Sequence, residues 1–104
     1  ATLVPIMVGS TSEKAEAMYG KLLAPYLEKS ENFFVISSDF CHWGKRFRYT
    51  YGKDEQAPIH ETIERLDRLG MDTIETLSPK QFYSYLKKYQ NTICGRHPIG
   101  VLMQ

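Results

Sequence analysis

One apolar run constrains the fold of this sequence more than any other stretch. Residues 33–36 (Phe-Phe-Val-Ile) combine aromatic and β-branched side chains without a turn former, which is typical of a buried strand. Residues 2–8 have the same character, although Pro5 cannot donate a ladder hydrogen bond and indicates an edge strand or a local irregularity. A helical pattern separates the two runs. This order of strand, helix and strand predicts a βαβ-type unit, and hence an α/β fold.

The helix between the two runs is predicted from its apolar spacing. It is expected to follow a turn at residues 9–12 and to extend to about Tyr26, with Glu13 and Glu16 near its positive end. Its apolar residues recur at three- and four-residue steps, which predicts one buried face. The residues of that face are Ala15, Met18, Tyr19, Leu22, Leu23 and Tyr26.

Proline and glycine mark the later helices. Pro58 is expected to begin a helix that ends at Gly70, and a short helix follows over residues 71–77. Ser78 and Pro79 are typical of the start of another helix. The residues that this helix is expected to turn inward are Phe82, Tyr85, Leu86 and Tyr89. Pro98 is expected as the first residue of the last helix, and residues 45–56 are predicted to form a loop.

Composition narrows the class of protein. The 104 residues suffice for a single domain, and 42% hydrophobic with 24% charged residues is typical of a globular chain. A net charge of +1 gives no reason to expect nucleic acid as a partner, and no apolar run approaches the roughly 20 residues of a membrane span. Two cysteines do not indicate a disulfide framework. With no signal-like N-terminus, these features predict the cytoplasm, with the nucleus as a second compartment.

Two polar clusters are the candidates for a functional site. Residues 37–44 (Ser-Ser-Asp-Phe-Cys-His-Trp-Gly) place an acid, a thiol, an imidazole and an indole directly after the second predicted strand. Residues 94–98 (Cys-Gly-Arg-His-Pro) repeat this character just before the last predicted helix. A helix N-terminus favours a thiolate, so Cys94 has a physical reason to act as a metal ligand or nucleophile. We expect the two clusters to face one pocket.

Each of these residues also has a structural interpretation. Asp39 could cap the turn after the strand, and His42 could be a hydrogen-bonded structural histidine with Asp39 as its partner. Cys41 is more typical of a small buried apolar residue. His97 could cap the last helix, and Arg96 could bind a carboxylate or phosphate with two hydrogen bonds.

The chain resembles the Memo family, named as mediators of ErbB2-driven cell motility. The resemblance rests on residues 35–44 with the Arg-Phe-Arg-Tyr segment at 46–49, on residues 91–101, and on Tyr-Leu-Lys-Lys-Tyr at 85–89. Memo proteins are roughly two to three times as long as this chain. The resemblance therefore implies a single partial domain over residues 1–104, without the first half and the C-terminal end of the family fold.

The resemblance also implies a fold and a metal. Memo proteins are similar in fold to the class III extradiol non-haem iron dioxygenases, which have a mixed central sheet flanked by helices. It implies Cys94 as a ligand of iron or copper, His42 at the position of the dioxygenases' catalytic histidine, and Asp39 beside it. The two histidine ligands of the family are absent from this chain, so we expect the remainder of the protein or a second chain to complete the site.

Two functions of different classes follow. The first is metal-dependent redox chemistry linked to cell motility signalling, with His42 and Asp39 as the catalytic residues near the metal. Replacement of the dioxygenases' carboxylate by a thiolate argues against ordinary extradiol chemistry. The second is an adaptor without catalysis, in which the pocket binds a phosphotyrosine peptide of a receptor. The residues expected to bind that peptide are Arg46, Arg48, Arg96 and His97.

Overall fold

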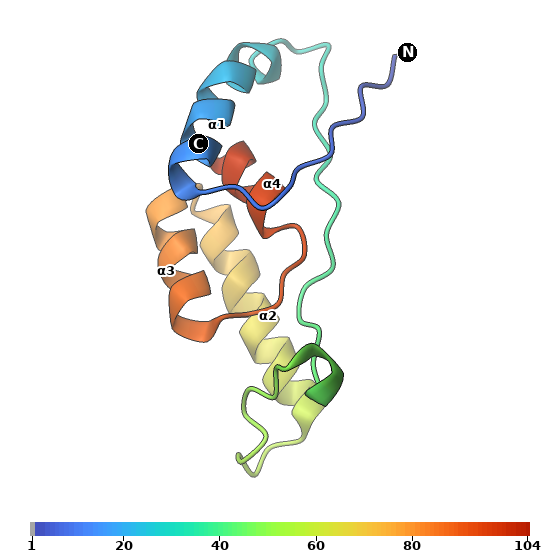
Figure 1. Ribbon diagram of the computed structural model, residues 1–104, viewed down its shortest axis with the longest axis vertical. Coiled ribbons are helices and arrows are strands. Elements are labelled where there is room, and N and C mark those ends of the chain that lie inside the picture. The colour runs from blue at the N-terminus through green and yellow to red at the C-terminus, as the bar shows by residue number, and fades with distance from the viewer. Residues whose placement is uncertain (1) are drawn as a thin grey trace.

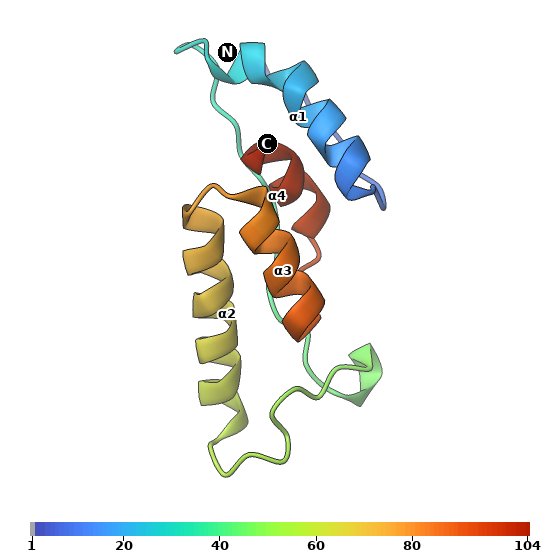
Figure 2. The same ribbon diagram turned by 90° about the vertical axis from the view of Figure 1, so that its left-hand side faces the viewer.

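The computed structural model describes residues 2–104 and is helical. Its α-helices are α1 (Glu13–Leu27), α2 (Ile59–Glu75), α3 (Pro79–Tyr89) and α4 (Arg96–Met103), with a short 3-10 helix, η1 (Lys45–Phe47). Helix α1 packs on α4, α4 packs on α3, and α3 packs on α2. Figures 1 and 2 show this succession, with α1 at one end of the molecule and α2 beside α3.

The predicted α/β fold with a mixed central sheet is wrong for this chain. Residues 2–8 and 33–36 are extended but form no strand, and residues 2–104 contain only an isolated bridge between Gly44 and Tyr49. An apolar pattern favours extended backbone, whereas a strand also needs a partner to pair with. Neither run has one here, and Phe33 and Val35 are largely exposed.

The face predicted to be buried on α1 is also wrong. Met18, Tyr19, Leu22 and Tyr26 are all exposed, while Glu16 and Gly20 are buried. The reason is that α1 packs on α4 through a different face, where glycine permits close approach. A side chain at Gly20 would come within 2.9 Å of the carbonyl oxygen of Val101. Apolar spacing thus identified the helix but not the face that it buries.

Helix α2 is longer than the sequence predicted. It continues through Gly70 to Glu75, so there is no separate helix over residues 71–77. Gly70 lies inside the helix, where the lack of a side chain lets α3 approach closely. A Cβ at this position would lie 2.9 Å from the hydroxyl of Tyr85. The helix ends instead at the Thr76 C-cap, followed by Leu77 with a positive φ of 57°.

Helix α3 confirms its prediction. Ser78 is the N-cap, Pro79 is the first helical residue, and the Ser78 hydroxyl accepts a hydrogen bond from the Gln81 N–H at 3.4 Å. Phe82 and Tyr85 are buried as expected. They belong to a core whose buried apolar members are Leu66, Phe82, Tyr85, Ile93, Ile99 and Met103. Ile93 is buried in this core and anchors the loop that contains Cys94.

Helix α4 begins two residues earlier than expected. Arg96 is its first residue and Gly95 its N-cap, so neither Pro98 nor His97 has the predicted role at the helix start. Pro98 is tolerated in the first turn because N–H groups there have no partner within the helix. Cys94 directly precedes the N-cap. In Figure 1 the segment after α1 descends beside the loop between α3 and α4.

Candidate functional site

The two clusters identified in the sequence are in contact. The backbone N–H of Asp39 donates to the sulfur of Cys94 at 3.2 Å, and the Ser38 hydroxyl lies 3.7 Å from the same sulfur. The Gly95 N–H donates to the Ser38 hydroxyl at 2.9 Å. Fifty-five residues separate Asp39 from Cys94 in the sequence, so the fold brings them together. Both residues are exposed, which places the site at the surface of this chain.

His42 is held by Thr92. Its Nδ1 lies 2.8 Å from the carbonyl oxygen of Thr92, its backbone N–H donates to the Thr92 hydroxyl, and that hydroxyl donates to the His42 carbonyl at 3.0 Å. A carbonyl oxygen only accepts, so Nδ1 carries the hydrogen and Nε2 is left unprotonated in the neutral ring. The expected partnership between His42 and Asp39 is replaced by this one.

Cys41 lies in a different environment from Cys94. It is partly buried against the core, and its backbone N–H donates to the Asp67 carboxylate at 3.3 Å. Burial, reinforced by the negative charge of Asp67, raises the pKa of the Cys41 thiol. Both cysteines are free. Of the two, Cys41 is therefore the one suited to packing, as its sequence context indicated.

A buried network of hydrogen bonds stabilises the loop that binds His42. Asn91 donates to the Asp67 carboxylate and to the Tyr85 hydroxyl, both at 2.9 Å, and Tyr85 donates to the Leu66 carbonyl at 2.7 Å. Asn91 also accepts from the Thr92 N–H at 2.8 Å. The network joins α2 and α3 to the loop that holds His42. Its members are buried or partly buried, so each hydrogen bond limits the movement of that loop.

The predicted phosphopeptide-binding residues do not form a single cluster. Arg46 and Arg48 are exposed on the turn at η1, which lies beside His42 because the rings of His42 and Phe47 are 5.3 Å apart. Arg96 is exposed but donates to the Ile93 carbonyl at 3.1 Å. The Nδ1 of His97 lies 2.8 Å from the buried Glu16 carboxylate. His97 is therefore engaged within the protein.

Both contacting clusters lie within a region that matches one known protein family. The family model described as "Memo-like protein" matches residues 1–104. The chain belongs to the Memo-like family. It is 61% identical over 102 residues to "Protein MEMO1" of Xenopus tropicalis and 57% identical to that of Homo sapiens, in each case over 98% of this chain and 34% of the relative. "Protein memo-1 homolog" of Caenorhabditis elegans is 51% identical over 99% of this chain and 30% of its own length.

This Memo-like chain spans about a third of the length of those relatives. Within residues 2–104, no three His, Cys, Asp or Glu side chains are grouped so that they could hold a metal ion. Cys94 fits the chemistry of one thiolate ligand for iron or copper, and this stretch alone does not complete a ligand set. No helix in the described part of the chain is long and apolar enough to span a membrane.

Sequence reasoning missed several residues of this Memo-like site. Thr92, Asn91 and Asp67 carry its hydrogen bonds, and none of them was singled out as a site residue. Asn91 and Thr92 begin the segment at 91–101 that carries the family resemblance, which is the signal that could have found them. Asp67 lies on α2 among charged residues and resembles solvated surface until the fold brings Asn91 to it.

Proposed function

We propose that this Memo-like chain supplies one side of a metal-binding redox pocket, with Cys94 as a ligand of iron or copper. The observation that supports this most is the 3.2 Å contact from the Asp39 N–H to the Cys94 sulfur. The sulfur in turn lies 3.6 Å from the Asp39 carbonyl oxygen, so the backbone of Asp39 holds it in place from both of its polar groups. The thiolate is the form of cysteine that binds metals. The exposure of Cys94 leaves its sulfur accessible to a ligand from outside this chain.

His42 is the proton-handling group in this proposal. Because its Nδ1 hydrogen is committed to the Thr92 carbonyl, Nε2 is the atom that can accept or return a proton. Thr92 also fixes the backbone on both sides of the ring, so the imidazole keeps its direction. Asp39 contributes its backbone N–H to Cys94, and its exposed carboxylate adds negative charge beside the site.

Completion of the pocket requires residues beyond this stretch. We propose that two histidines from the remainder of the protein, or from a second chain, join Cys94. Iron or copper bound there would supply one-electron redox chemistry, and the protein's part is to hold Cys94 and orient His42. A place in cell motility signalling, in the cytoplasm or the nucleus, is proposed on the family resemblance.

Metal content tests this proposal. Cys94→Ser in the complete protein is expected to lose bound iron and copper, measured by elemental analysis after gel filtration. Cys41→Ser is the matched control, because Cys41 is the other free cysteine and is bound to Asp67 through its backbone. Equal metal in Cys94→Ser and the unsubstituted protein would contradict the redox pocket.

A second candidate is an adaptor that binds a phosphotyrosine peptide of a receptor without catalysis. Its support is the basic turn at η1, which carries exposed Arg46 and Arg48 and whose Phe47 ring lies 5.3 Å from the ring of His42. Arginine binds phosphate through charge-assisted, paired hydrogen bonds. Arg96 and His97 are weaker contributors in this proposal, because each already binds another group of the protein.

A further inference from the structure

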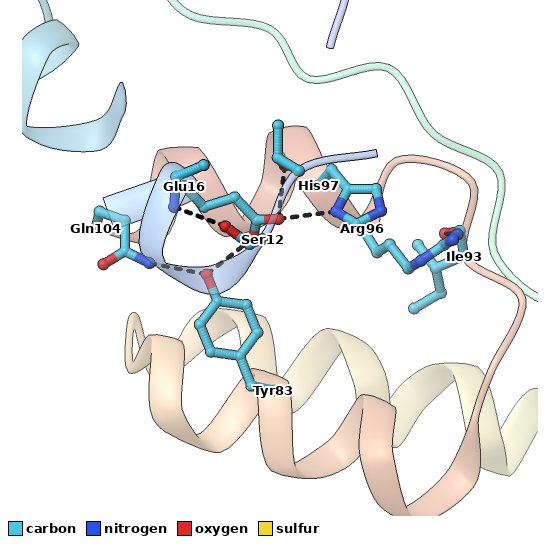
Figure 3. Close-up of polar contacts among 9 residues, drawn as sticks. Ser12, Glu16, Tyr83, Ile93, Arg96, His97 and Gln104 are labelled. Carbon is cyan, nitrogen blue, oxygen red and sulfur yellow. Dashed lines mark hydrogen bonds and ion pairs between the residues drawn. The ribbon is translucent and has the colours of Figure 1, made fainter. Parts of the chain in front are cut away.

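Glu16 is a buried carboxylate that neither proposed function uses. It lies on α1 with 2% of its surface exposed and accepts hydrogen bonds from three side chains, as Figure 3 shows for two of them. Tyr83 donates to Oε1 at 2.8 Å, and Thr11 at 2.7 Å and His97 Nδ1 at 2.8 Å bind Oε2. A buried carboxylate without such donors would be strongly destabilising. The three contacts from Tyr83, Thr11 and His97 therefore supply hydrogen-bond partners to both oxygens of this buried carboxylate.

The neighbours of Glu16 determine which atom carries each hydrogen. The Gln104 amide nitrogen, which only donates, lies 2.9 Å from the Tyr83 hydroxyl, so the hydroxyl directs its own hydrogen to Glu16. An ionised carboxylate only accepts, so Nδ1 of His97 is also protonated.

The carboxylate acts on the first turn of α4. His97 is the second residue of that helix and lies three residues after Cys94. Gly100, one turn later, packs directly against Glu16, and a methyl group there would overlap Oε1. The start of α4 is held a second time where the Ser38 hydroxyl accepts from the Gly95 N–H. Cys94 is thus attached to a turn that is fixed at two points.

We propose that Glu16 is a positioning residue for the Cys94 loop. It holds His97 in the Nδ1-protonated form, fixes the first turn of α4, and so keeps Cys94 in register with the N–H of Asp39. The inference concerns only residues of this chain and does not depend on a bound metal or peptide. The positioning role can therefore be wrong while the proposed function is correct, and the proposed function can be wrong while the positioning role is correct.

The first experiment follows the tautomer of His97 by long-range 1H–15N NMR on the full chain at a pH where the ring is neutral. Nδ1 is expected to be protonated in the unsubstituted protein. Glu16→Leu removes the acceptor of Nδ1, so the ring should change from the single Nδ1–H tautomer to a mixture of the two tautomers. Glu13→Leu, in the same helical turn but exposed, is the control and should change nothing. An unprotonated Nδ1 in the unsubstituted protein, or an unchanged tautomer in Glu16→Leu, overturns the proposal.

The second experiment tests whether His97 transmits the effect to Cys94. Amide hydrogen exchange is measured at Asp39 and Gly95, whose N–H groups bind Cys94 and Ser38. His97→Ala is expected to speed both exchange rates about tenfold, because the turn loses its contact with a buried charge. His97→Asn, whose amide nitrogen takes the place of Nδ1, should stay within about threefold of the unsubstituted protein. Unchanged exchange in His97→Ala, or no rescue by asparagine, contradicts a positioning role.

Discussion

The Nδ1 atom of His42 lies 2.8 Å from the carbonyl oxygen of Thr92, fifty residues away in the sequence. The Thr92 hydroxyl meets the backbone N–H and carbonyl of His42 as well, so this pair is joined by three hydrogen bonds. One of the three sets the tautomer, and the other two set the position of the backbone. The direction of the His42 ring is therefore a property of the loop between α3 and α4.

Thr92→Val separates these two contributions. Valine has the shape of threonine but no hydroxyl, so the His42 N–H and carbonyl lose their partner while the Nδ1 contact to the backbone remains. We expect a loss of about 1–3 kcal/mol in the free energy of unfolding, measured with urea. Thr92→Ser, which keeps the hydroxyl, should lose less than half as much. Equal losses for the two variants would show that the hydroxyl contributes nothing.

The two cysteines are expected to differ in reactivity. Burial and the charge of Asp67 raise the pKa of Cys41, which lowers its thiolate fraction at neutral pH, whereas Cys94 is exposed. Iodoacetamide should therefore alkylate Cys94 first, by roughly tenfold in rate, as followed by peptide mass spectrometry of the folded protein. Alkylation in denaturant is the control, because unfolding removes the environment of Cys41 and should make the two rates similar. Faster alkylation of Cys41 in the folded protein would contradict the structure.

Sequence patterns predicted the helices better than the sheet for a physical reason. A helix satisfies its backbone within its own segment, so Ser78 and Pro79 suffice to mark the start of α3. A strand is completed by another segment, and the apolar run at residues 33–36 carries no information about whether one is present. The prediction that Gly70 ends a helix was wrong for a related reason, because the role of this glycine is set by Tyr85 on another helix.

The contact between the two clusters was predicted, whereas the hydrogen bonds that support it were not. The unusual residue types at 37–44 and 94–98 indicated two clusters, and the contact from Asp39 to Cys94 joins them. The sequence predicted that Glu16 lies near the positive end of α1, and Glu16 is indeed in the first turn of that helix. Its burial against His97 was not predictable, because it depends on how α1 lies on α4.

Alkaline pH should weaken the core through Tyr85. Burial raises the pKa of Tyr85 from its ordinary value of 10 to about 12, so the unfolded chain releases this proton at lower pH than the folded chain does. Its contribution to stability is complete below pH 10 and is lost as the pH rises toward 12. Tyr85→Phe should lower stability at neutral pH by about 1–2 kcal/mol, since Leu66 and Asn91 lose a partner.

The same variant should show a shallower decline in stability between pH 10 and pH 12, measured by urea unfolding at each pH. Tyr49 and Tyr83 also have raised pKa values through burial, so part of the decline remains. Tyr26→Phe, at an exposed position of α1, is the control and should leave the slope unchanged. An identical slope in Tyr85→Phe would mean that Tyr85 does not contribute to the alkaline transition.

Gly70→Ala tests the close approach of α2 and α3. Alanine favours a helix over glycine by about 1 kcal/mol, but its methyl group would lie 2.9 Å from the Tyr85 hydroxyl and 3.1 Å from the adjacent ring carbon. Because Tyr85 is buried and bound to Leu66, it cannot move aside, and we expect a net loss of about 1–3 kcal/mol. In the Tyr85→Phe background the nearest atom is gone, so the loss should shrink. A double-mutant cycle without coupling would contradict this packing.

The adaptor proposal makes a prediction about the basic turn at η1. Arg46→Ala should weaken binding of a phosphotyrosine peptide by about three- to tenfold, because an exposed arginine contributes modestly to phosphate binding. Isothermal titration with the phosphorylated peptide and its unphosphorylated twin measures the difference. Arg68→Ala is the control, since Arg68 is exposed on α2 and its charge is paired with Glu64 at 3.3 Å. Equal losses for both peptides, or an equal effect of Arg68→Ala, would count against a phosphate site at Arg46. A selective loss in Arg46→Ala that is also seen in the Cys94→Ser background would favour an adaptor that needs no metal.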